Sequence, residues 1–109
     1  MKKFVFVYYG KVRAEDISKE NMKATMDKWM MWFGTFKDQM VDGGNPFGPV
    51  AKVVTKGDVK TISADKWPAK GYTIVNAKDM DEAVEIAKGC PALEDDEEGS
   101  VRVYEALPM

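Results

Sequence analysis

The opening strand predicted over residues 3–9 is apolar or aromatic on both faces after its first residue, Lys3. Alternation along a strand divides its side chains between two faces, with Phe4, Phe6 and Tyr8 on one and Val5, Val7 and Tyr9 on the other. Such a strand belongs in a sheet whose two faces are both covered. Any fold proposed for this chain must therefore provide two layers of cover.

A long helix is predicted to begin after Ser18, which suits the N-cap position. Ile17 and Met22 have the spacing of a hydrophobic staple around that cap. Apolar side chains then recur at spacings of four and three, which places them on one stripe of a helix; they are Met22, Met26, Trp29, Phe33, Phe36 and Met40. Gly43 and Gly44 are predicted to end the helix.

This stripe is interpreted as core rather than as the lining of a cofactor pocket, because apolar side chains at helical spacing usually pack inside. Met31 falls opposite the stripe and Trp32 on its flank, where one or both could face a partner or a pocket.

The rest of the chain alternates β-favouring segments with turn residues and one more helix. A β-hairpin is predicted over 50–55 and 59–63, a loop over 64–71 and a strand over 72–76. The D-x-x-E signal at Asp79 starts a second helix, whose predicted buried residues are Met80, Ala83, Val84 and Ala87. The acidic run over 94–98 is interpreted as a solvated loop, and 101–104 as the last strand.

The predicted order, β-α-β-β-β-α-β, is that of a single α+β domain over 1–109, a ferredoxin-like sandwich with an antiparallel sheet and two helices on one face. Two helices leave the other face bare, although the first strand is apolar there. A second copy of the chain is the predicted cover, which gives a homodimer. The alternative is a monomer with a half-solvated sheet.

Several short motifs in the last third of the chain resemble the YCII-related family, particularly its DGPF-containing branch. They are Gly71-Tyr72-Thr73-Ile74-Val75, Asp79-Met80-Asp81-Glu82-Ala83, Ala87-Lys88-Gly89-Cys90-Pro91 and Gly99-Ser100-Val101-Arg102-Val103. The first strand, ending in Tyr8-Tyr9-Gly10, and the long first helix are similar too. The resemblance implies a dimeric α+β barrel, in agreement with the two-faced first strand.

Two departures from the family pattern bear on function. Where the branch has Asp-Gly-Pro-Phe, this chain has Asp65-Lys66-Trp67-Pro68 in a shorter loop. Some members of the wider family have a histidine and an aspartate proposed as an acid-base pair, and this chain has no histidine. The resemblance therefore implies a fold without carrying over a reaction.

Composition excludes several classes of function. Sixteen basic and eighteen acidic side chains are mixed along the sequence, which argues against a nucleic-acid partner. No segment approaches the roughly 20 apolar residues of a membrane-spanning helix. A single cysteine, Cys90, indicates a reducing cytoplasm and is interpreted as an inert packed thiol. No phosphate-binding glycine pattern or metal cage is found, so neither a cofactor nor a metal is predicted.

The predicted ligand site combines the loop 64–71 with the end of the first strand. Its candidate residues are Tyr9, Arg13, Asp65, Lys66, Trp67 and Arg102. Asp65 is the candidate catalytic base, because apolar Trp67 beside it would raise its pKa, although Lys66 would lower it. Alternatively Asp65 is a turn residue, Trp67 closes a gap in the core, and Arg102 pairs with a neighbouring acid.

Two functions from different classes remain open. The first is a domain that binds a small molecule, and is possibly an enzyme, with a pocket between the helices and the sheet or inside the dimeric barrel. The second is a non-catalytic dimerisation or protein-interaction module. A roomy pocket with converging polar groups favours the first, and a solidly packed interior favours the second.

Overall fold

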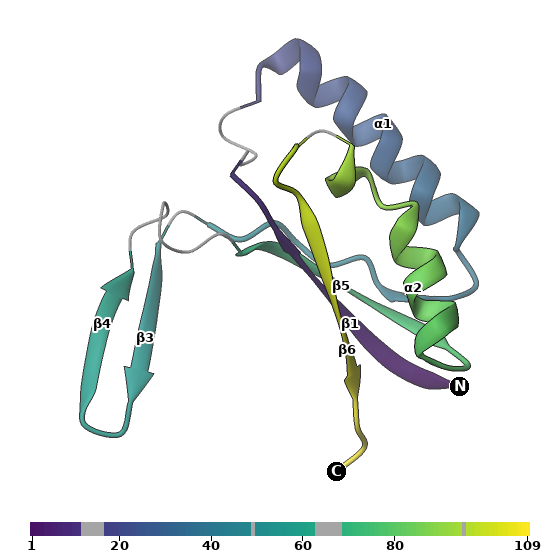
Figure 1. Ribbon diagram of the computed structural model, residues 1–109. Coiled ribbons are helices and arrows are strands. Elements are labelled where there is room, and N and C mark those ends of the chain that lie inside the picture. The colour runs from purple at the N-terminus through teal and green to yellow at the C-terminus, as the bar shows by residue number, and fades with distance from the viewer. Residues whose placement is uncertain (12–16, 49, 63–68, 95) are drawn as a thin grey trace.

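The computed structural model describes residues 1–11, 17–48, 50–62, 69–94 and 96–109 (Figure 1). Its main sheet has four antiparallel strands in the order β2-β5-β1-β6. These strands are β1 (Lys2–Tyr9), β2 (Met40–Asp42), β5 (Ala69–Ala77) and β6 (Ser100–Ala106). The helices α1 (Lys19–Thr35) and α2 (Met80–Lys88) and the short 3-10 helix η2 (Pro91–Leu93) lie on one side of this sheet. The predicted α+β, ferredoxin-like fold is confirmed.

Strand β1 is central, between β5 and β6, and its side chains divide as the sequence pattern predicts. Phe4, Phe6 and Tyr8 are buried against the helices, at no more than 5% exposure. Opposite Phe4 and Phe6, strand β5 places Val75 and Thr73, which are fully buried. The core therefore lies between β1, β5 and the two helices.

Helix α1 begins as predicted but ends much earlier. The Ser18 side chain caps it by accepting a hydrogen bond from the Asn21 N–H at 3.3 Å. The helix ends at Thr35 rather than near Gly43, and 40–42 forms β2, where Met40 pairs with Val75. The helical spacing continues past Thr35 because Phe36 and Met40 pack on the same core from a turn and a strand.

Trp32 is the residue of α1 most deeply placed in the core, which corrects its predicted position on the flank of the stripe. It is 4% exposed, and its indole N–H donates to the carbonyl of Ile86 at 3.0 Å. Met31, by contrast, is 75% exposed on the opposite side, as the helical spacing predicts. Trp32, rather than the whole predicted stripe, is therefore the main contact of the shorter helix with the core.

The predicted hairpin is present as β3 (Ala51–Thr55) and β4 (Asp58–Ile62), but it does not join the main sheet. It forms a two-stranded sheet of its own that stands apart from the helices and the four main strands in Figure 1. The expected place of the hairpin in the sheet was wrong, because the edge position beside β5 is taken by β2.

Helix α2 is capped by Asp79, whose side chain accepts from the Glu82 N–H at 2.9 Å. Its buried side contains Ala83, Ile86 and Ala87, whereas Met80 is 41% exposed, contrary to the prediction. The helix has only nine residues, so the face defined by positions 83, 86 and 87 contacts the sheet and its first residue does not.

Candidate functional site

A cavity of about 390 Å³ lies between α1, the loop 43–47 and the adjoining ends of β1 and β5. Its size is within the range of about 300 to 1,000 Å³ that is typical of small-molecule sites. Most of its wall is apolar or aromatic, including Met22, Met26, Trp29, Phe33, Phe47 and Pro91. Four residues of the predicted helical stripe thus border an open space, which corrects the interpretation of the whole stripe as solid core. It also explains the 52% exposure of Met26.

A chain of hydrogen bonds runs along one side of the cavity. The Tyr8 hydroxyl donates to Thr73 Oγ1, and Thr73 Oγ1 donates to the carbonyl of Gly43 at 2.9 Å. The carbonyl can only accept, so the single hydroxyl proton of Thr73 is committed to it. Tyr8 must therefore supply the proton of the first bond, which leaves its oxygen as an acceptor.

Burial raises the pKa of Tyr8 above its ordinary range, and the nearby Cys90 raises it further. The phenol therefore stays protonated at neutral pH and cannot act as a phenolate base. The Tyr8 ring also packs edge-on against Trp29, with 5.2 Å between ring centroids. Tyr8 is thus a fixed, neutral hydrogen-bonding group in an aromatic wall.

The loop 43–47 closes another side of the cavity and is held to β5 by the backbone. The Phe47 N–H donates to the Lys70 carbonyl at 2.7 Å, and Pro46 forms a bridge with Gly71. The Phe47 ring stacks on Tyr72 with centroids 5.9 Å apart. These contacts make the loop a continuation of the sheet edge.

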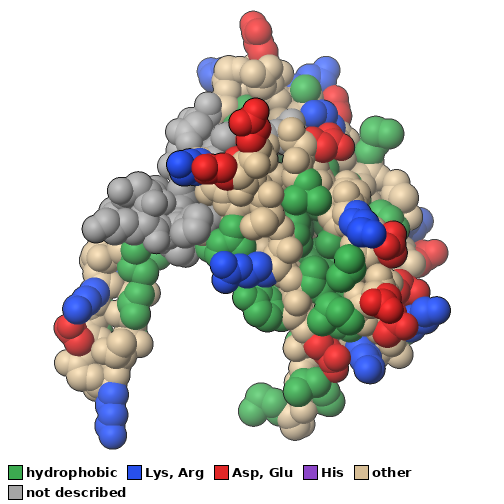
Figure 2. Space-filling model, in the orientation of Figure 1, with side chains coloured by type: hydrophobic (Ala, Val, Ile, Leu, Met, Phe, Trp, Pro, Cys, Tyr) green, Lys and Arg blue, Asp and Glu red, His purple; other side chains and the backbone are tan. Residues whose placement is uncertain are grey.

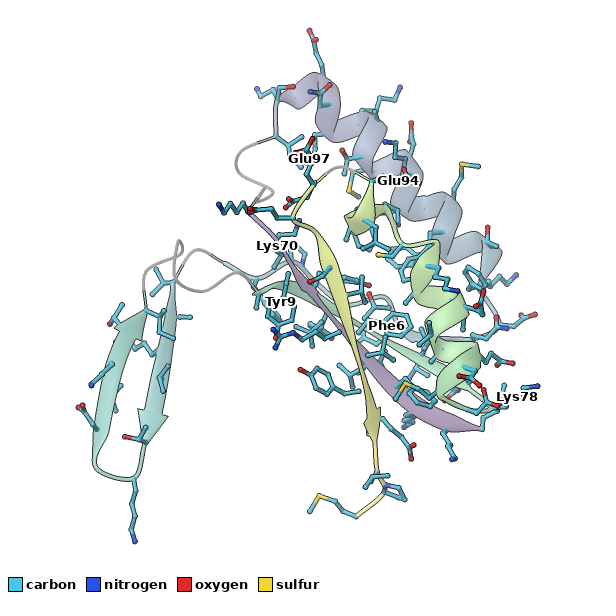
Figure 3. The ribbon with its side chains drawn as sticks, viewed as in Figure 1. Phe6, Tyr9, Lys70, Lys78, Glu94 and Glu97 are labelled. Carbon is cyan, nitrogen blue, oxygen red and sulfur yellow. The ribbon has the colours of Figure 1, made fainter. Side chains whose placement is uncertain are left out.

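Lys70 supplies the one charged side chain among the described residues of the cavity wall. Its Nζ lies 3.3 Å from Asp96 Oδ2, and the two side chains are only 17% and 4% exposed. Figure 3 shows Lys70 at the same end of the sheet as Glu94 and Glu97. The prediction of a solvated acidic loop is corrected at Asp96, which is buried and paired.

Two of the predicted site residues, Tyr9 and Arg102, lie together on the sheet face away from the helices. The Arg102 guanidinium carbon is 4.3 Å from the centroid of the Tyr9 ring. The side chains of Tyr104 and then Tyr9 raise the pKa of Arg102, which is charged in any case. Figure 3 shows Tyr9 on the opposite side of the sheet from Phe6. Neither residue lines the cavity.

The other predicted site residues, Arg13, Asp65, Lys66 and Trp67, lie outside the described residues. Two members of the predicted region are described and do line the cavity, namely Lys70 and Gly71. Tyr8, near the end of the first strand, does so as well.

The sequence did not single out Lys70, Thr73 or Asp96. Thr73 could have been found only as a polar residue on the buried face of a strand. Lys70 and Asp96 are 26 positions apart and occupy unremarkable polar segments, so their pairing had no local signal.

Cys90 is the buried thiol that the sequence predicts, at 1% exposure, and burial raises its pKa from 9.0 to about 11. The folded state thus favours the neutral thiol.

We expect Cys90 to add no pH dependence to the free energy of unfolding below pH 9. As the pH rises from 9 through 11, the free energy of unfolding should fall by about 2.5 kcal/mol because of this thiol. Urea titrations at pH 7, 9, 10 and 11 measure this, and the Cys90→Ala variant should show a flatter decline. An equal decline in both proteins would contradict it.

Among the described residues, no three side chains of the His, Cys, Asp and Glu types are grouped as metal ligands. Within the same residues, no helix has the length and apolar character needed to cross a bilayer.

Comparisons with known proteins bear on the fold alone. No family model and no curated protein matches this chain. Among solved structures, the fold is similar to that of 5-chloro-2-hydroxyhydroquinone dehydrochlorinase from Burkholderia phenoliruptrix AC1100, determined in complex with 2,5-dihydroxybenzoquinone. The two chains share 14% identity, with a TM-score of 0.51 over 94% of this chain and 90% of the other. This chain therefore has the α+β fold of that enzyme, over nearly the whole length of both.

Proposed function

We propose that this chain is a YCII-related homodimeric domain that binds a small aromatic molecule in the cavity between α1 and the sheet. The observation that carries the proposal is the cavity itself, which is large enough for a ligand and has an aromatic wall. The similar fold of a dehydrochlorinase solved with a quinone bound supports a small cyclic ligand and leaves open an enzymatic role.

The polar groups of the wall indicate which end of a ligand they would bind. The Tyr8 proton is donated to Thr73, so towards a ligand the Tyr8 oxygen acts as an acceptor, which suits a hydroxyl or N–H group. The rings of Trp29, Phe33 and Phe47 would pack against the ligand's apolar body. A ring that carries a hydroxyl group has both properties.

The cavity is tested with N-phenyl-1-naphthylamine, a neutral aromatic probe that fluoresces when it leaves water. We expect binding to the native protein and at least about tenfold weaker binding to Thr25→Trp, because the new indole would fill the space beside α1. Met31→Trp is the matched control, on an exposed part of the same helix outside the cavity wall, and should bind as the native protein does. Absence of binding, or equal binding by both variants, would refute the proposal.

The homodimer is proposed from the sheet face that the helices leave uncovered, here called the open face. It is formed by Val5, Val7, Tyr9, Tyr72, Ile74, Arg102 and Tyr104. Figure 2 shows hydrophobic side chains exposed over the middle of the molecule, where β1 and β6 run. Tyr104 is 48% exposed there, and Val5, Val7 and Ile74 are only partly covered. A second copy would cover this apolar surface.

A charge placed in the middle of the open face should separate the dimer. Val7 lies between Tyr72 and Arg102 in the sheet, so Val7→Lys would put a second cation beside Arg102. In sedimentation equilibrium at micromolar concentration, we expect twice the chain mass of 12.2 kDa for the native protein and the single mass for the variant. Met31→Lys, on the helical side, should remain dimeric. A native protein at the single mass would rule the dimer out.

A further inference from the structure

A β-bulge interrupts the regular pairing of β5 with β1 at Lys70. Tyr8 pairs with Gly71 and the next residue, Tyr9, pairs with Ala69, so Lys70 is the extra residue between two register positions. In a regular strand Lys70 would point to the face opposite Gly71, which is the open face. A bulge changes the direction of a side chain locally. Here Lys70 reaches the cavity wall and Asp96 instead.

The structure also leaves room for this lysine beside the end of β1. A Cβ atom at Gly10 would lie 2.2 Å from Asp96 Oδ2 and 3.2 Å from Lys70 Nζ, so any larger residue would displace the pair. Asp96 is held in turn by the Glu98 N–H, which donates to Asp96 Oδ1 at 3.0 Å. The ammonium group is therefore kept in place by a partner that is itself fixed.

Lys70 and Asp96 are not equally accessible from the cavity. Lys70 lines the wall, whereas Asp96 does not and is only 4% exposed. A bound molecule would meet the ammonium rather than the carboxylate. Asp96 accepts from one of the three Nζ–H groups, so the ammonium retains donors for a ligand. Because the rest of the described wall is uncharged, the attraction between Lys70 and an anion would be weakly screened.

We propose that Lys70 makes this cavity selective for anions, so that its ligands are aromatic molecules bearing an acidic oxygen group such as a carboxylate, a sulfonate or an ionised phenol. This inference rests on the proposed function, since it requires the cavity to bind a ligand. In this arrangement Asp96 positions Lys70 and lowers the net charge that the ligand encounters.

The test compares two probes that share an anilinonaphthalene frame. 8-Anilinonaphthalene-1-sulfonate carries an anionic group, and N-phenyl-1-naphthylamine is neutral. Removal of Lys70 alone would take away the ammonium that faces the buried Asp96 carboxylate, so the informative variant is the double change Lys70→Met with Asp96→Asn. We expect it to bind the sulfonate about tenfold more weakly and the neutral probe within about twofold of the native protein.

The single variant Asp96→Asn should change the affinity for the sulfonate in the opposite direction. It removes the carboxylate that partly neutralises Lys70, so binding of the sulfonate should become several-fold tighter while the neutral probe is unaffected. Equal losses for both probes, or an unchanged preference in the double variant, would show that Lys70 only shapes the wall and would overturn the inference. Failure of the proposed function is separate, because the neutral probe would then not bind or would ignore Thr25→Trp.

Discussion

Replacing Trp32 with alanine is expected to lower the free energy of unfolding by about 4 kcal/mol, as other buried tryptophans do when truncated. Its indole is 4% exposed and lies against the rings of Phe6, Trp29 and Phe33, with centroids 5.5 to 6.2 Å away. It also joins α1 to α2 through its hydrogen bond to the Ile86 carbonyl. The substitution would leave a large cavity where the two helices meet β1.

Urea titration of the variants measures this effect and separates its parts. Trp32→Phe keeps most of the ring but loses the hydrogen bond, and should cost only about 1 to 2 kcal/mol. Met31→Ala changes the adjacent residue, which is 75% exposed, and should lie within about 0.5 kcal/mol of the native protein. A loss below about 1.5 kcal/mol for Trp32→Ala would show that Trp32 is not central to the core.

Replacing Gly44 with alanine is expected to cost at least about 3 kcal/mol, because the backbone conformation and the available space both oppose a side chain. Gly44 has φ of 79°, and a Cβ atom there would lie 1.6 Å from the carbonyl oxygen of Tyr72. The contact is with backbone, so relief requires the loop 43–47 to move away from β5. Since this loop forms one side of the cavity, the variant should also bind N-phenyl-1-naphthylamine more weakly.

Gly34 offers a matched control of opposite sign. It lies in the last turn of α1, has no atom within 4 Å of the position of an added Cβ, and does not have a positive φ. Gly34→Ala should therefore stabilise the protein by about 0.5 to 1 kcal/mol, through the higher helix propensity of alanine. Similar urea midpoints for the two variants would contradict the role assigned to Gly44.

Local signals in the sequence were sufficient wherever neighbouring residues decide the structure. Ser18 and Asp79 each accept from the backbone N–H three positions ahead, so the starts of both helices could be predicted. The alternation of β1 can be recognised without knowing its neighbours, and it indicated a strand with two apolar faces. The hairpin was predicted from its turn, although the second strand begins at Asp58, one residue before the predicted start.

The end of α1 could not be predicted in the same way. Phe36 and Met40 continue the helical spacing although they belong to a turn and to β2, because both segments pack on the core that α1 contacts. The backbone of Phe36 bonds locally, donating to the Trp32 carbonyl, whereas Met40 pairs with Val75 of β5, more than thirty positions away. Beside Met40, the Asn76 N–H of β5 donates to the Gln39 carbonyl at 2.7 Å. Because β2 pairs with β5 at the sheet edge, the hairpin forms a separate two-stranded sheet, which its local turn signal did not indicate.

The sequence by itself determined the class of fold, because the alternation of β1 and the caps of both helices depend on residues that are close to one another in the chain. It also determined that the chain has no histidine to act as a general acid or base. Only the tertiary structure decided the candidate site. The cavity is bounded by α1, the loop 43–47 and the ends of β1 and β5, and its polar groups come from two strands, Tyr8 on β1 and Thr73 and Lys70 on β5. Their meeting depends on strand register and on one bulge, which are properties of paired segments rather than of either segment alone.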